Sequence, residues 1–366
     1  MAVAQSPETF GYNQLPNTTT GYEFPAFDTN VEQITLQEAG EPDQFGNILD
    51  RYRVVMSDGT KLGLNHCIPK DPVTNVPILE TPAWFTGLHG YNEHSQRAFG
   101  SMGLPSLEIG HVGEERDPWV KELARLVLNP ANVAKEMRQI SLARQAHNMI
   151  NILKSSAEMF SLDDRQAFVF GNSRGAMTLL GVLAAKDKYD IEVPFALGVA
   201  PCFKEGLGRE KITNFSLQLP LEILNGTRIG AENLIAWGAV SPNTLNASPK
   251  SLAYEFAHAP TLFRGDAGEF LHGIDTNQHL LLLSYGNDIA GQMRLWQKGL
   301  KEHPHAHIRK VPGAHGSLID KRTHDYCMRA FKPISEQLGD GTNTNNLDLS
   351  YIEAHSKSTK LNADVA

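Results

Sequence analysis

Residues 166–180 of the 366-residue chain read QAFVFGNSRGAMTLL and constrain the fold more than any other segment. An apolar run at 167–170 is followed by a glycine-containing turn and then by a stretch of small and apolar residues. This pattern predicts a strand, a sharp turn with Ser173 at its tip, and a helix. Gly171 and Gly175 lie two positions either side of Ser173, where we expect a side chain to collide with the neighbouring strand or helix. The turn would hold the Ser173 hydroxyl at the carboxyl edge of a sheet, beside a helix N-terminus.

Strand and helix patterns alternate along the rest of the chain. Further strands are predicted at 31–39, 51–69 (interrupted by a turn at Asp58-Gly59), 82–90, 104–110, 193–201, 279–286 and 306–313, and helices at 133–160 and 174–186. Several strands are apolar on both faces, which is typical of strands covered by helices on both sides. The sequence therefore predicts the α/β class, with a mostly parallel central sheet.

The same reading divides the chain into a core, an insertion and two tails. We expect the core at 31–201 and 279–338, a loosely ordered N-terminal extension at 1–30 and a polar tail at 339–366. Residues 202–278 interrupt the alternation and are too long for a bare loop, so we interpret them as an inserted cap or lid. An elaborated surface insertion without a role in function is the alternative.

Composition excludes several classes of partner. A formal net charge of −8 and the lack of a basic stripe argue against nucleic-acid binding. The three widely spaced cysteines form neither a disulfide framework nor a zinc pattern. The apolar runs are too short to span a membrane, and the N-terminus lacks the features of a signal peptide, so a cytoplasmic location is expected. The oligomeric state is left open.

A serine nucleophile needs a base, which is normally a histidine oriented by a carboxylate. His315 follows the last predicted strand in a glycine-flanked loop, at the edge where Ser173 is expected. Asp288 follows the preceding predicted strand and is our candidate for the acid. Glu205 and, more distantly, Asp266 are the rival acids.

An oxyanion also needs two N–H donors. We assign one to the backbone amide of Arg174 and the other to that of Tyr91, with Asn92 as the alternative. His89, in the same turn, is interpreted as a structural hydrogen-bonding residue. For the Arg174 side chain, an acidic substrate group and a salt bridge to the lid are equally plausible partners.

Two further groups of residues leave alternatives open. His303, His305 and His307 alternate along the chain and could bind a metal, but solvated histidines before a strand are the preferred interpretation. His111 and Glu114 follow the strand at 104–110 and could approach the pocket, or could serve only the loop.

Four motifs in chain order resemble those of the α/β-hydrolase superfamily: HGY after the third strand, the GNSRG turn, SYGND and PGAHG. The resemblance covers about residues 30–335, and no second oxyanion-loop glycine follows Gly90, unlike the loop of some lipases. It implies an open, mostly parallel sheet, acyl transfer by Ser173, His315 and Asp288, and neither a cofactor nor a metal. We therefore expect a serine hydrolase acting on a small-molecule carboxylic ester or thioester. The alternatives are an acyltransferase or an amidase or peptidase with the same triad, and a catalytically silent binding module.

Overall fold

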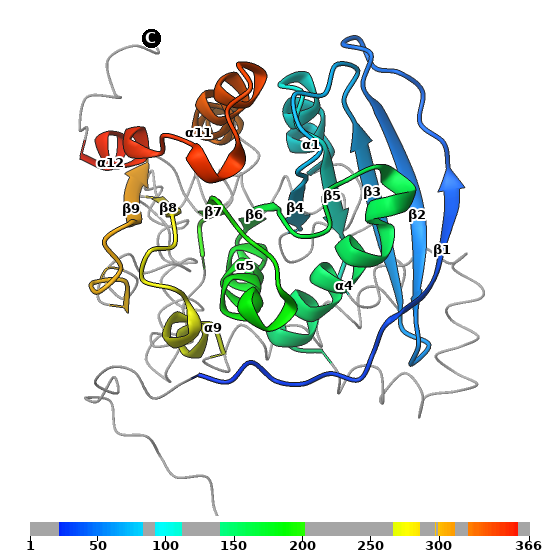
Figure 1. Cartoon of the computed structure of the whole chain (residues 1–366), viewed down its shortest axis with the longest axis horizontal. Helices are drawn as coiled ribbons and strands as arrows, with labels where there is room; N and C mark the ends of the chain where they lie inside the picture. The colour runs from blue at the N-terminus through cyan, green and yellow to red at the C-terminus, as the bar shows by residue number, and fades with distance from the viewer. Residues whose placement is uncertain are drawn as a thin grey trace, which may run out of the picture.

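The computed structural model describes residues 22–82, 92–111, 140–201, 266–285, 297, 299–311 and 321–357. Within these residues, nine strands form one sheet in the order β1-β2-β3-β5-β4-β6-β7-β8-β9 (Figure 1). Helices cover both faces, so the predicted α/β class with a central sheet is confirmed.

The first strands form the antiparallel side of the sheet. β1 (Val31–Glu38) pairs with β2 (Ile48–Met56), β2 pairs with β3 (Lys61–Ile68), and β3 pairs with β5 (Ser106–Ile109), each antiparallel. The predicted turn between β2 and β3 is confirmed: Gly59 has a φ of +83°, a backbone conformation that glycine adopts without steric cost. β1 is one of the two edge strands of the sheet, and most of its side chains are exposed.

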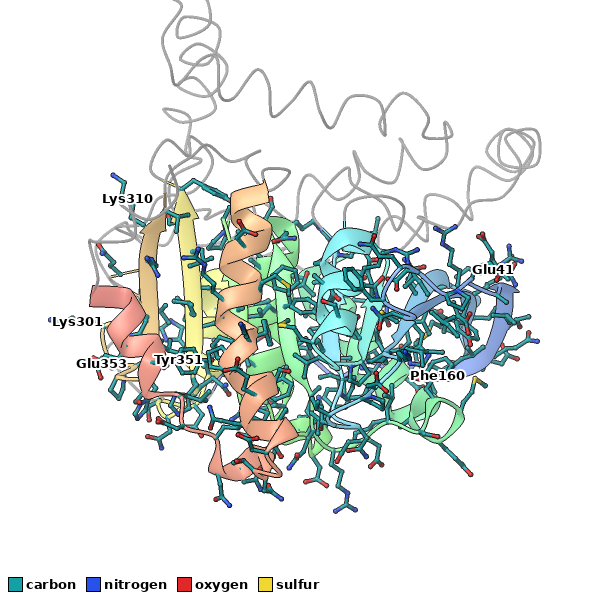
Figure 2. The ribbon with its side chains drawn as sticks, turned by 90° about the horizontal axis from the view of Figure 1, so that it is seen from above. Glu41, Phe160, Lys301, Lys310, Tyr351 and Glu353 are labelled. Atoms are coloured by element: carbon teal, nitrogen blue, oxygen red, sulfur yellow. The ribbon has the colours of Figure 1, made fainter. Side chains whose placement is uncertain are left out.

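The remaining strands run parallel to one another, as predicted. They are β5, β4 (Ile78–Thr81), β6 (Phe168–Asn172), β7 (Ala196–Val199), β8 (Leu280–Tyr285) and β9 (Ala306–Val311). Parallel strands place all their carboxyl ends at one edge of the sheet. Figure 2 shows this edge at the top, where Lys310 marks the carboxyl end of β9.

One observed strand, β4, lies in a segment where the sequence predicts no strand. The sequence predicts a strand at 82–90, but β4 spans Ile78–Thr81 and has ended by Pro82. Residues 83–91 lie outside the described part of the chain. The short β4 lacks an apolar run because it contains Glu80, which the fold buries completely.

The side on which successive strands join the sheet changes at β4. β5, the next strand in the sequence, pairs with one side of β4, and β6, the strand after it, pairs with the other side. Right-handed crossovers then place the connecting helices on opposite faces. α1 (Asn92–Ser101), α11 (Lys321–Gly339) and α12 (Ser350–Lys357) cover one face, and α4 (Leu142–Phe160), α5 (Arg174–Ala185) and α9 (Asp266–Phe270) cover the other (Figure 1). Short 3₁₀ helices span Asp187–Tyr189, Leu271–Gly273 and Thr344–Asn346. No helix in the described ranges is both long enough and apolar enough to cross a membrane.

Helix α4 starts later than the predicted 133–160. Ser141 precedes it in extended conformation, and its side chain accepts a hydrogen bond from the Arg144 amide at 3.0 Å. Such an N-cap satisfies an amide that has no partner within the helix. Ser161 ends the helix in a left-handed conformation. Residues 133–139 lie outside the described part.

Parts of the predicted tails and insertion pack against the core. Phe24, in the predicted N-terminal extension, is buried and contacts Phe270 of α9. Residues 266–278, at the end of the predicted insertion, include α9, which packs against α5. In the predicted polar tail, Ile352 of α12 is buried and the Tyr351 hydroxyl donates to the Ala330 carbonyl at 2.6 Å (Figure 2). A few apolar anchors are enough to order these otherwise polar segments.

Candidate active site

Ser173 is the single residue between the end of β6 and the start of α5, as predicted. Its backbone angles are φ 51° and ψ −112°, a conformation that a residue with a side chain rarely adopts. Such strain costs about 1–3 kcal/mol and persists where the surroundings enforce it. One enforcing contact is the hydrogen bond from the Ser173 amide to the Val199 carbonyl at 2.7 Å. The strand, turn and helix predicted from the sequence are therefore confirmed, and the serine at the tip is held in strained backbone.

The two flanking glycines are required by close backbone contacts. A Cβ added at Gly171 would overlap the Gly175 carbonyl in the first turn of α5. A Cβ added at Gly175 would overlap the Thr81 carbonyl at the end of β4. The collisions with helix and strand that the sequence predicts are thus present, and they bring the start of α5 directly against β4.

The backbone amide of Arg174 lies at the first position of α5. The first amides of a helix have no acceptor within it, and the helix dipole adds partial positive charge there. Both effects favour a negatively charged oxygen next to Ser173. The position is suited to a donor for an oxyanion.

The Arg174 side chain makes a contact that the sequence did not predict. It is fully buried, and its Nη1 lies 2.5 Å from Nδ1 of His111, which is also fully buried. His111 Nε2 lies in turn 2.9 Å from the Pro82 carbonyl oxygen. The partners expected for Arg174 were an acidic substrate group or the lid, and His111 was expected in the pocket or in a loop. The structure instead joins these two residues beyond the ends of β6 and β5, the two strands that flank β4.

Two buried glutamates lie next to each other below this edge. Glu80 of β4 and Glu108 of β5 are opposite each other in the parallel register, and both are fully buried. The Ser95 hydroxyl of α1 donates to Glu80 at 3.1 Å, and the Asn65 amide donates to Glu108 at 2.9 Å. Burial, followed by the neighbouring charge of Glu108, raises the pKa of Glu80 well above its ordinary value. The neutral form of the Glu80 carboxyl is therefore favoured in the folded protein.

The glutamate pair was not predicted from the sequence. The available signal was a glutamate inside each of the short segments ILET and SLEI. A charged residue within a buried strand needs a partner, and adjacent parallel strands can supply one.

Three residues of the predicted site, Asp288, His315 and Tyr91, lie outside the described part of the chain. The strands that precede the first two are described. β8 ends three residues before Asp288, and β9 ends four residues before His315. Both ends belong to the same sheet edge as Ser173. The triad and the Tyr91 donor stay predictions. Asn92, the alternative donor, is the first residue of α1.

The rival candidates fall in different places. Glu205, Glu114 and His89 lie outside the described residues. Asp266 opens α9, whose Phe270 packs against Gly181 in the half of α5 that lies away from Ser173.

The alternating histidines lie at the start of β9, at the sheet edge opposite Ser173. His303 is buried, and the His305 ring lies 4.7 Å from that of His279. Burial, and the nearby His305 and His307, lower the pKa of His279. In the described ranges no group of three or more His, Cys, Asp or Glu side chains is arranged to hold a metal ion.

Comparison with known proteins supports the fold. No family model and no curated protein sequence matches the chain. Among solved structures, the chain is similar to Est816, described as an N-acyl homoserine lactone degrading enzyme, with 17% identity over 75% of this chain and 98% of that chain and a TM-score of 0.53. It is also similar to DcsB, solved in complex with a substrate analogue, with 14% identity over 84% of this chain and all of that chain and a TM-score of 0.51. The strand order, the strained serine between β6 and α5, and these likenesses together show that the chain has the fold of the α/β-hydrolase superfamily.

Proposed function

We propose that this protein is a serine hydrolase that cleaves a carboxylic ester or thioester through an acyl-enzyme on Ser173. The observation that carries the proposal is the strained backbone of Ser173 between β6 and α5. Ser173 is flanked by Gly171 and Gly175, two positions at which no side chain would fit. This geometry presents a hydroxyl at the carboxyl edge of the sheet, where ligands bind in open α/β folds. Strained backbone of this kind clusters at functional sites.

In the proposed reaction, the Ser173 hydroxyl attacks the acyl carbon while His315 accepts its proton. Asp288 orients the imidazole and stabilises its charged form. The amides of Arg174 and Tyr91 donate to the oxyanion of the tetrahedral intermediate. His315 then returns the proton to the leaving alcohol or thiol, and later activates a water molecule that releases the acid.

The choice of ester chemistry is supported by the fold and by one relative of known reaction. Est816 degrades a lactone, which is a cyclic ester, with a chain of similar fold. The same acyl-enzyme could pass its acyl group to an alcohol or amine, so product analysis with competing nucleophiles is part of the test. The predicted cap within 202–278 would line the acyl or alcohol pocket.

The experiment is covalent labelling of the intact protein with a fluorophosphonate probe, followed by peptide mapping, in parallel with hydrolysis of p-nitrophenyl acetate. We expect a single adduct on Ser173. The Ser173→Ala variant should lose labelling and roughly 10³-fold or more of the rate. Ser156→Ala, which removes a buried hydroxyl near the C-terminal end of α4, is the matched control and should behave as wild type. Wild-type hydrolysis by Ser173→Ala would overturn the proposal.

A further inference from the structure

A buried chain of three groups joins three strand ends next to Ser173. Arg174 opens α5 directly after the turn, His111 follows β5 by two residues, and Pro82 is the first residue after β4. The Arg174 and His111 side chains are completely buried. Arg174 Nη1 lies 2.5 Å from His111 Nδ1, and His111 Nε2 lies 2.9 Å from the Pro82 oxygen. The three strands β5, β4 and β6 are neighbours in the sheet (Figure 1).

The chemistry of the two outer groups determines the state of the imidazole between them. A guanidinium can only donate hydrogen bonds, and a carbonyl oxygen can only accept them. Nδ1 of His111 must therefore be unprotonated and accept from Arg174, while Nε2 carries the proton and donates to Pro82. A second proton on Nδ1 would face the guanidinium N–H groups and break the contact. His111 is thus a neutral imidazole in a single tautomer.

The link joins the two segments of the chain to which the proposed oxyanion donors belong. One proposed donor is the amide of Arg174, the residue whose side chain holds His111. The other, Tyr91, lies in the segment that leaves β4 at Pro82, the residue that His111 bonds. The close contact between Gly175 and the Thr81 carbonyl joins the same two elements through their backbones. His111 therefore connects the two backbones that would supply the donors.

We propose that His111 is a positioning residue, which fixes the start of the oxyanion loop at Pro82 relative to the Arg174 amide. It touches neither the substrate nor the reacting atoms in this proposal, and the inference rests on the proposed function of Ser173. Oxyanion donors stabilise the transition state much more than the bound substrate, and loss of one such donor costs about 10²–10³-fold in kcat. A loosened loop should thus lower kcat and leave KM nearly unchanged.

Two substitutions of His111 separate positioning from bulk packing. His111→Leu fills the site but can neither accept from Arg174 nor donate to Pro82. His111→Gln retains both functions, because its amide oxygen can accept and its amide nitrogen can donate. With p-nitrophenyl acetate, we expect His111→Leu to lower kcat by about 10–100-fold with KM within about 2-fold, and His111→Gln to recover most of the wild-type kcat. Equal kcat for wild type and a folded His111→Leu would overturn the inference, as would an effect on KM alone.

A second measurement does not depend on activity or on the folding of the leucine variant. Nitrogen NMR of ¹⁵N-histidine-labelled protein, with the His111 signals identified by their loss in His111→Gln, reports which ring nitrogen carries the proton. We expect protonated Nε2 and unprotonated Nδ1 at pH 7, in wild type and in Ser173→Ala. The opposite tautomer, or an imidazolium, would refute the arrangement. The two proposals also fail separately: retained hydrolysis in Ser173→Ala removes the proposed function, whereas the His111 inference fails when Ser173 is essential and His111→Leu leaves kcat intact.

Discussion

His66 should make the stability of this protein depend strongly on pH below neutrality. Its side chain lies in β3, is 3% exposed, and packs against the Phe160 ring with a centroid distance of 4.2 Å. Burial, only partly opposed by the nearby charge of Asp50, lowers the pKa of His66 from 6.5 to about 4. The folded state therefore holds His66 neutral at a pH where the unfolded chain is already protonated.

The sign and size of the effect follow from this difference. Because the folded pKa is the lower one, the unfolded state binds more protons between pH 6.5 and 4, and stability falls as the pH falls through that range. At about 1.4 kcal/mol per pH unit, the loss from His66 is about 2 kcal/mol at pH 5 and about 3 kcal/mol at pH 4. Above pH 6.5 this contribution to stability is fully present.

The test is the variant His66→Phe, which keeps an aromatic ring against Phe160 and cannot be protonated. Urea unfolding at pH 7, 5 and 4 gives the free energy of unfolding for each protein. Relative to its value at pH 7, we expect the variant to gain about 3 kcal/mol over wild type by pH 4. His272→Phe, at an exposed histidine, is the control and should follow the wild-type curve. Parallel curves for wild type and His66→Phe from pH 7 to 4 would refute the reasoning.

Three further predictions concern the core around the site. Because the pKa of Glu80 is raised in the folded state, its contribution to stability is lost as the pH rises above 4.5 and through the raised value. Glu80→Gln cannot ionise, so its Tm should increase relative to that of wild type when the pH is raised from 6 to 9. A Tm difference independent of pH would contradict this and the assigned influence of Glu108. Gly175→Ala forces a Cβ into a backbone carbonyl and should lower stability by about 1–3 kcal/mol and abolish probe labelling, whereas Gly339→Ala, whose Cβ would have ordinary contacts, should leave labelling unchanged. Phe331→Ala removes a buried ring that contacts three other aromatic rings and should cost about 3–5 kcal/mol in urea unfolding, so a loss below about 1 kcal/mol would contradict its central place in the packing.

Local patterns were sufficient to predict most of the parallel sheet. The apolar runs at 166–170 and 279–286 became β6 and β8 with shifts of a few residues at most. Strands buried on both faces are apolar at successive positions, so composition alone marks them. The turn at Ser173 was predictable from its two glycines. Gly171 leaves room for the first turn of α5, and Gly175 leaves room for the adjacent strand β4.

The strand that the sequence did not predict is one that depends on its neighbours. β4 has four residues, one of which is Glu80, and its sequence resembles a loop more than a strand. It is a strand because β5 and β6 pair with it on either side. The burial of Ile352 in α12 was not predicted either. It depends on an apolar surface formed by residues that are distant in the sequence.

The sequence alone determined the α/β class, the mostly parallel sheet and the serine at a glycine-flanked turn. Each of these depends on spacing within about fifteen residues, where chain geometry dictates which side chains share a face. Only the tertiary structure decided that the Arg174 side chain bonds His111 and that Glu80 lies beside Glu108. These pairs come from segments whose proximity is set by strand order, and their charge states are set by burial, neither of which a linear pattern contains.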